Sequence, residues 1–184
     1  MVTFIAPGLL DKGIALVGME LDLDTSKISN SVKETLARYE YNPDVAQPFT
    51  VSLNAFDRND KPIAVLGFAE GVLHKKPLLL DDAFKYCRQV LYLHMLYIEK
   101  EYEKCGVATN VLDYLPKLID TEMVATIDAV VLAPVPQYKG PDGQIVQLPL
   151  GIEFLVNYRK LVNFYSKRNF HFCQSFLLMG RMVA

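Results

Sequence analysis

The sequence has few cysteines, and nothing in their spacing would join them. Cys87, Cys105 and Cys173 lie far apart in a chain of 184 residues and form no CxxC pair. Disulfide-rich secreted domains and cysteine zinc sites both need closer, patterned cysteines. We therefore expect a cytoplasmic protein that folds without a bound metal.

Long apolar runs and concentrated positive charge are also missing. No stretch of about 18 apolar residues occurs, and the apolar N-terminus has no basic opening and is interrupted by Asp11 and Lys12. We therefore expect no signal peptide and no membrane span. The formal net charge is -2 and the Lys and Arg residues are scattered, so nucleic acid is only a minor option as a partner.

What the sequence does contain is apolar residues in periodic segments. They make up 51% of the chain, which is enough to bury a core within one domain. The first half predicts a helix capped by Asp24, Thr25 or Ser26 and then two antiparallel strands over residues 49–73. The helix would bury Ile28, Val32, Leu36 and Tyr39. Residues 78–90 fit either a short helix or strands.

The second half predicts a strand, a charged turn and a helix. The strand covers residues 89–98, five of the six residues 99–104 are charged, and the helix follows Gly106 until Pro116 ends or kinks it. Its buried face would carry Val107, Val111 and Tyr114 or Leu115. Further on we expect a strand at 126–135, a loop at 133–151, a helix at 152–169 and one or two closing strands at 170–183. The last helix has an apolar stripe of Leu155, Tyr158, Leu161 or Val162, and Tyr165.

The charged turn leads into a helix through a glycine. The first N–H groups of a helix have no partner within it, and the positive end of the helix dipole lies beside them. A strand, turn and helix of this kind therefore form a place that holds anions.

The stretch Tyr102-Glu103-Lys104-Cys105-Gly106-Val107-Ala108 resembles the acyl-CoA pyrophosphate loop of the GNAT superfamily of N-acyltransferases. That loop reads Gln or Arg, two residues, Gly, one residue, then Gly or Ala, and this chain matches it at Gly106 and Ala108. A second segment is similar to the family's helix that ends in Phe-Tyr, here Phe164 and Tyr165, before a strand that begins at Phe170. Asn169 stands where the family usually has Gly, and Asn also tolerates the left-handed conformation.

Two positions depart from the family pattern. Glu103 stands where the family has Gln or Arg, and it either faces the pyrophosphate or points outward to solvent. An Asn common in the family's fourth helix is replaced by Tyr158, and Asn157, one residue earlier, is expected to face elsewhere.

The resemblance implies a fold, a co-substrate and a reaction. The fold would be a GNAT-like mixed α/β (α+β) domain, a mostly antiparallel twisted sheet flanked by helices, with a helical acceptor-side region at 1–48 and a sheet core at 49–184. The reaction would transfer acetyl from acetyl-CoA to an amine by direct attack in a ternary complex. The residues implied to bind acyl-CoA are Leu96, Tyr97, Ile98, Glu103, Lys104, Cys105, Gly106, Val107, Ala108 and Thr109, and a backbone N–H of Leu96, Tyr97 or Ile98 would polarise the carbonyl.

The resemblance implies that Tyr165 is the general acid. The alternative role for this residue is that of a buried tyrosine that only packs. For the base, His94 titrates near neutrality and shares a strand face with Tyr92 and Leu96. Glu99 and Glu101 are competing candidates for the base. The alternative for His94 is a structural role, with its imidazole hydrogen-bonded within the sheet. Cys105 is expected to be a bystander.

The acceptor amine has no specific sequence signature. The acidic residues that can attract a cation are Glu20, Asp22, Asp24, Glu34 and Glu40, and they fit a solvated helix face equally well. The loop from Pro134 to Leu150 is expected to add to the acceptor side. A catalytically inactive GNAT-like binding or regulatory module is the alternative to an enzyme. The sequence leaves the oligomeric state open, with a homodimer as one possibility.

Overall fold

The computed structural model describes residues 1–24, 26, 28–38, 45–75, 84, 86–173 and 178–183. In chain order its elements are β1 (Val2–Phe4), η1 (Pro7–Lys12), β2 (Leu16–Asp22), α1 (Asn30–Arg38), β3 (Ala46–Phe56), β4 (Pro62–His74), β5 (Val90–Ile98), η4 (Lys100–Tyr102), α2 (Val107–Met123), β6 (Ala129–Leu132), β7 (Gln137–Lys139), β8 (Ile145–Gln147), α3 (Ile152–Ser166), β9 (His171–Phe172) and β10 (Met179–Met182).

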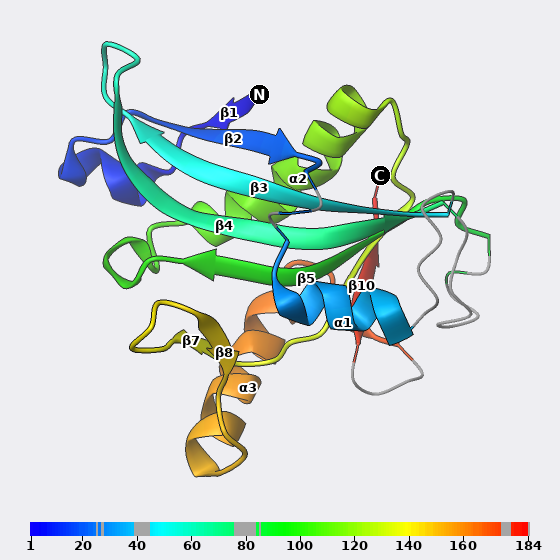
Figure 1. The fold of residues 1–184 in the computed structure, drawn as a ribbon. Helices are drawn as coiled ribbons and strands as arrows, with labels where there is room; N and C mark the ends of the chain where they lie inside the picture. Colours follow the sequence, from blue (N-terminus) through cyan, green and yellow to red (C-terminus); the bar gives the residue numbers. More distant parts are fainter. Residues whose placement is uncertain are drawn as a thin grey trace.

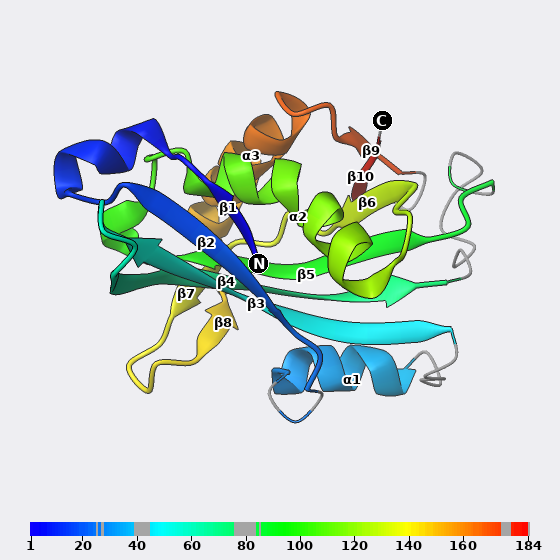
Figure 2. The same cartoon turned by 90° about the horizontal axis from the view of Figure 1, so that it is seen from above.

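One large sheet organises these elements. Its strand order is β1-β2-β3-β4-β5-β6-β10-β9, and β7 and β8 form a separate hairpin. The described strand pairs are antiparallel except β5 with β6, which is parallel. Helices α2 and α3 cover one face and α1 covers the other (Figure 1, Figure 2). The expected mixed fold, a mostly antiparallel sheet flanked by helices, is confirmed.

The main core lies between the sheet and α2. The helix buries one stripe of residues at helical spacing against the strands: Val107, Val111, Leu112, Leu115, Leu118 and Ile119. Tyr114 is half-buried and stacks on Phe4 of β1, with ring centroids 5.6 Å apart. The predicted apolar face of this helix is therefore confirmed.

The helix α2 continues through Pro116. Of the two predicted alternatives, that Pro116 ends or kinks the helix, the first is therefore wrong. A proline cannot donate to the carbonyl four residues earlier, which leaves the Leu112 oxygen without its helical partner. The guanidinium of Arg181 on β10 donates to that oxygen at 2.6 Å. A side chain distant in sequence thus satisfies the carbonyl that the internal proline leaves without a helical partner.

The region before residue 48 is mostly not helical, contrary to expectation. It contains β1, η1 and β2, and α1 is its one α-helix in the described residues. Val17 and Met19 are fully buried at alternate positions of β2, which is the period of a strand. The helix begins at Asn30, where the Ser29 hydroxyl accepts a hydrogen bond from the Val32 N–H at 3.3 Å, so the predicted cap positions are wrong.

Some of the other predictions are confirmed, and some fall outside the described residues. Ile28 and Val32 are buried as predicted, whereas Tyr39 and the side chain of Leu36 lie outside the described residues, as do residues 78–83 of the ambiguous segment. The strands predicted at 49–73, 89–98, 126–135 and 170–183 are confirmed. The predicted loop at 133–151 contains the hairpin β7–β8, which turns through Gly143 at a φ of 80°.

The last helix also differs from its predicted packing. Only Tyr165 is buried among the residues of α3, and Leu155 is 56% exposed. The apolar stripe therefore packs at its C-terminal end and not at its start. No helix in the described ranges is long and apolar enough to span a membrane.

Candidate functional site

The sheet opens between β5 and β6. Their parallel pairing runs only from Val90 opposite Ala129 to Leu93 opposite Leu132. β5 continues to Ile98, so beyond Leu93 this edge pairs with no strand of the described chain. Backbone groups between Leu96 and Ile98 on that edge can therefore meet a ligand.

The direction of these backbone groups follows from one hydrogen bond. The N–H of Glu99 donates to the Leu66 carbonyl of β4 at 2.8 Å. Because successive residues of a strand point their backbone groups to opposite edges, Tyr97 also faces β4. The amides of Leu96 and Ile98 consequently point to the open edge.

The turn after β5 prepares the start of α2 for an anion. Lys104 and Gly106 have φ values of 61° and 89°, both left-handed. Gly106 caps the helix without a side-chain hydrogen bond, so the first amides of α2 keep no capping partner. A Cβ on Gly106 would have Asn110 Nδ2 as its nearest neighbour, at 3.9 Å, which shows that the space above the turn is open.

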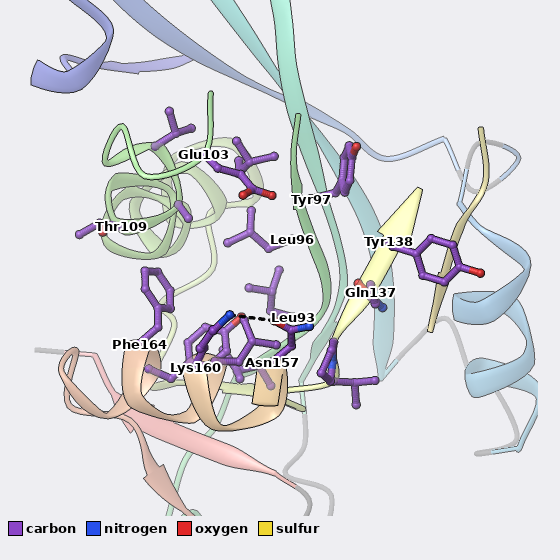
Figure 3. A pocket seen from close by; sticks show the side chains of 18 of the residues that line it. Leu93, Leu96, Tyr97, Glu103, Thr109, Gln137, Tyr138, Asn157, Lys160 and Phe164 are labelled. Carbon is purple, nitrogen blue, oxygen red and sulfur yellow. Dashed lines mark hydrogen bonds between the residues drawn. The ribbon is translucent and has the colours of Figure 1, made fainter. Parts of the chain in front are cut away.

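A cavity of about 750 Å³ joins the open strand edge to this helix start (Figure 3). Its floor includes β5 and the end of β6, and its walls come from the turn at 102–109, α3 and the residues around β7. Lys104, Lys160 and Arg168 carry positive charge at its walls, and Glu103 and Glu153 carry negative charge. A large, partly charged ligand fits this combination of size and lining.

The structure brings nearly all the predicted acyl-CoA residues together. The members that line the cavity are Leu96, Tyr97, Ile98, Glu103, Lys104, Gly106, Val107, Ala108 and Thr109. Cys105 does not line it, because its backbone packs against η1, where a Cβ on Gly8 would lie 2.7 Å from its Cα. Glu103 is exposed and borders the cavity near the start of α2 (Figure 3).

Tyr165 lies at the buried end of α3 with its ring held by two phenylalanines. Phe164 and Phe170 meet it edge-on, at centroid distances of 5.1 and 5.7 Å, and Asn169 adopts the predicted left-handed conformation at a φ of 61°. Burial raises the pKa of Tyr165 to about 12. The phenol is therefore protonated at neutral pH.

The hydroxyl of Tyr165 has a distinctive environment. It makes no hydrogen bond to another described residue. Its oxygen is not fully buried, and the residue lines the cavity, so solvent reaches this hydroxyl. A tyrosine that served only packing would be expected to satisfy its hydroxyl within the protein.

His94 also lines the cavity, at a β-bulge. Leu93 lies opposite Gly71 and Met95 opposite Glu70, so His94 is an extra residue on β5. The bulge puts Leu93 and Leu96 against the same core cluster, so the prediction that His94 shares a strand face with Leu96 is wrong. Burial lowers the pKa of His94, and the charge of Glu70 opposes that shift.

The competing bases are placed less favourably. The carboxylate of Glu99 accepts hydrogen bonds from Lys139 at 2.6 Å and from the Tyr97 hydroxyl at 3.1 Å, and the Lys139 contact lowers its pKa. Glu101, His74 and His171 do not line the cavity. In the described ranges, no group of three or more His, Cys, Asp or Glu side chains is arranged to hold a metal ion.

Two side chains of α3 overturn the expectation for this helix. Asn157 lines the cavity, whereas Tyr158 does not, so the prediction that Asn157 faces elsewhere is wrong. The Lys160 ammonium donates to the Asn157 side-chain oxygen at 3.4 Å (Figure 3). The cavity thus has an amide and a cation on one wall.

Sequence reasoning missed Arg168. Its guanidinium stacks on Phe164, 3.7 Å from the ring centroid, and donates to the Phe164 carbonyl at 2.7 Å and to the Thr109 hydroxyl through Nε at 3.1 Å. It lines the cavity beside the first turn of α2. Its position just after Tyr165 was the only signal in the sequence, and nothing local predicted that it would meet α2.

The residues expected on the acceptor side divide into two groups. From the segment Pro134 to Leu150, the cavity is lined by Val135, Pro136, Gln137, Tyr138 and Leu148. The acidic residues Glu20, Asp22, Asp24 and Glu34 do not line it, and Glu40 lies outside the described residues.

Several solved structures are similar to this chain. A structure of AtaTR bound with acetyl-CoA has a TM-score of 0.45 at 10% identity, and a KacTA–DNA complex has 0.45 at 11%. A mutant AtaT toxin bound to the C-terminus of the antitoxin AtaR and acetyl-CoA also has 0.45 at 10%. Each match covers 90% of this chain and 92% of the other. No family model and no curated protein matches the sequence. At similarities this low, function has to be sought in the residues of the site.

Proposed function

We propose that this chain is a GNAT-type N-acyltransferase that transfers acetyl from acetyl-CoA to an amine by direct attack. One observation carries the proposal: an unpaired strand edge, an uncapped helix start and a solvent-reached buried phenol border one cavity. Such a cavity can hold an extended thioester with its phosphates at the helix end and its carbonyl at the strand edge.

The reaction needs a donor that polarises the carbonyl, a base that takes the amine proton and an acid that protonates the departing sulfur. The chain has a candidate group for each. When bound, acetyl-CoA supplies the activated acyl group, and its carbon–sulfur bond breaks as the carbon–nitrogen bond forms. The amide of Leu96 or Ile98 would donate to the carbonyl oxygen as negative charge develops there. His94, directly or through water, would take the proton from the amine, and Tyr165 would give its phenolic proton to the departing sulfur.

Arg168 would bind phosphate in place of the Gln or Arg that the family has at position 103. We expect Arg168→Gln to weaken binding of acetyl-CoA about tenfold, because one partly exposed charged hydrogen-bond donor is lost. Acetyl-pantetheine, which lacks the nucleotide phosphates, should bind both forms equally. Arg159→Gln is the control, since Arg159 is an exposed arginine on α3, the helix that ends just before Arg168, and it does not line the cavity. Equal weakening for both ligands would rule out the phosphate role.

Glu103 should oppose the same phosphates. Glu103→Gln removes one negative charge at the cavity and is expected to tighten acetyl-CoA binding by on the order of 1 kcal/mol, mostly at low salt. Glu101→Gln removes the same charge from a neighbouring exposed position outside the cavity, and it should have little effect. Affinities for both variants that match wild type at every ionic strength would mean that the Glu103 carboxylate points to solvent.

The second candidate is a binding or regulatory module without turnover. The negative charge of Glu103 at the cavity favours it, because this charge would oppose the phosphates of acetyl-CoA. This form would bind acetyl-CoA weakly or not at all and would consume none of it with any amine. A screen of polyamines, lysine peptides and aminoglycosides for acetyl-CoA consumption separates the two candidates.

A further inference from the structure

Glu70 is the one buried polar or charged residue in the described part of the chain, with 6% of its surface exposed. It lies in the middle of β4, and its carboxylate accepts a hydrogen bond from the Ser29 N–H at 3.2 Å, just before α1. A carboxylate can accept about four hydrogen bonds. Its burial therefore calls for another favourable partner.

The bulge in β5 brings His94 opposite this carboxylate. His94 and Met95 together oppose the single residue Glu70, as two residues oppose one in a β-bulge. Such a bulge re-aims side chains, and bulges are frequent next to active sites.

Three contacts put the two side chains on the same face of the sheet. Val72, two residues after Glu70 on β4, packs in the cluster that includes Val32 of α1. Tyr92 lies directly opposite Val72, and its ring is 6.1 Å from the ring of His94. Glu70 and His94 therefore lie on the α1 side of the sheet, with His94 also reaching the cavity.

We propose that Glu70 is a positioning residue for His94, holding the imidazole at the cavity and stabilising the imidazolium that forms when the ring takes the amine proton. The catalytic part of this inference rests on the proposed acyltransferase function. The coupling between the two side chains does not. Glu70 itself need not touch substrate.

The charges around His94 make this coupling measurable. Burial lowers the pKa of the imidazole, and the Glu70 charge raises it. Tyr92 lies beside it on β5, and Tyr138, Glu153, Lys160 and Tyr165 line the same cavity. Lys33 and Glu34 of α1 are exposed to solvent. Removing the Glu70 charge should therefore lower the pKa of His94 further.

The test is an NMR titration of the imidazole resonances in the full chain. The sequence has three histidines, so the His94 signal is assigned as the one lost in His94→Gln. Glu70→Gln should lower the pKa of His94 by about one unit, as expected for loss of a neighbouring opposite charge, and leave His74 and His171 unchanged. Glu20→Gln, an exposed carboxylate of β2, is the matched control and should move none of the three.

A second measurement covers the case in which Glu70→Gln does not fold. In wild type, the carboxyl ¹³C resonance of Glu70 should show an inflection at the pH where His94 titrates, because coupled groups respond to each other's protonation. An unchanged His94 pKa in a folded Glu70→Gln variant, or no inflection in wild type, overturns the proposal whether or not the chain is an enzyme.

Turnover then tests the positioning role separately. With an accepted amine, Glu70→Gln should lower kcat roughly tenfold, a part of what a general base contributes, and move the acidic limb of the pH profile to lower pH. In a His94→Gln background the same change should have no further effect on kcat, since groups that act as a unit are not additive. Additive losses would assign Glu70 a purely structural role and overturn the proposal.

Discussion

Gly106→Glu is expected to abolish binding of acetyl-CoA and to leave the fold largely intact. The residue has a φ of 89°, a conformation that costs a non-glycine residue about 1 to 2 kcal/mol. Its side chain would enter the open space above the α2 amides and bring a negative charge to the place proposed for the pyrophosphate. We expect calorimetry to give a dissociation constant above about 1 mM, which corresponds to a binding free energy weaker than about -4 kcal/mol.

The control for this variant separates backbone strain from the local effect. Gly143 in the β7–β8 turn has a similar φ of 80° and open space around it, and it does not line the cavity. Gly143→Glu therefore introduces the same strain and charge elsewhere and should bind acetyl-CoA as wild type does. If Gly106→Glu binds as tightly as wild type, the assignment of the loop to the pyrophosphate is wrong.

Tyr165→Phe is expected to lower kcat by about 10²-fold with little change in the KM for acetyl-CoA, if proton transfer limits the rate. The phenol, with its pKa raised to about 12, is the proton donor that the proposal assigns to the departing sulfur. Because its hydroxyl bonds to no described residue, the ring contacts with Phe164 and Phe170 should survive the substitution. Acetyl-CoA consumption and thermal melting are measured on the same variant.

A structural tyrosine would give the opposite result. If its hydroxyl closed a buried hydrogen bond, the variant would lose roughly 1 to 3 kcal/mol of stability and keep its turnover. Tyr158→Phe is the matched control, because Tyr158 lies on α3, stacks on Phe154 and does not line the cavity. Unchanged kcat for Tyr165→Phe with an accepted amine would remove this residue from the mechanism.

The sequence predicted the parts of the fold that depend on local patterns. The strand β5, the turn through Gly106 and the buried face of α2 follow from residues close together in the chain. Pro116 shows the limit of such reasoning. The helix continues through this proline, and the Leu112 carbonyl that it leaves unpaired is satisfied by Arg181 of β10, a residue far away in the sequence.

The candidate site was predictable only where its geometry is local. The loop positions from Glu103 to Thr109 are consecutive, and all but Cys105 line the cavity. Arg168 reaches the start of α2 only in the folded chain, by bonding to Thr109. The bulge at His94 could not be predicted either, because it depends on the register of β5 against β4.

Titration of the full wild-type chain with acetyl-CoA by calorimetry tests the central claim most directly. The proposed site predicts saturable binding with one ligand per chain and a dissociation constant well below about 1 mM. It also predicts weaker binding of acetyl-pantetheine, which cannot use Arg168 or the α2 amides. No binding of acetyl-CoA at about 1 mM would contradict the assignment of this cavity to an acyl-CoA and, with it, the proposed acyltransferase.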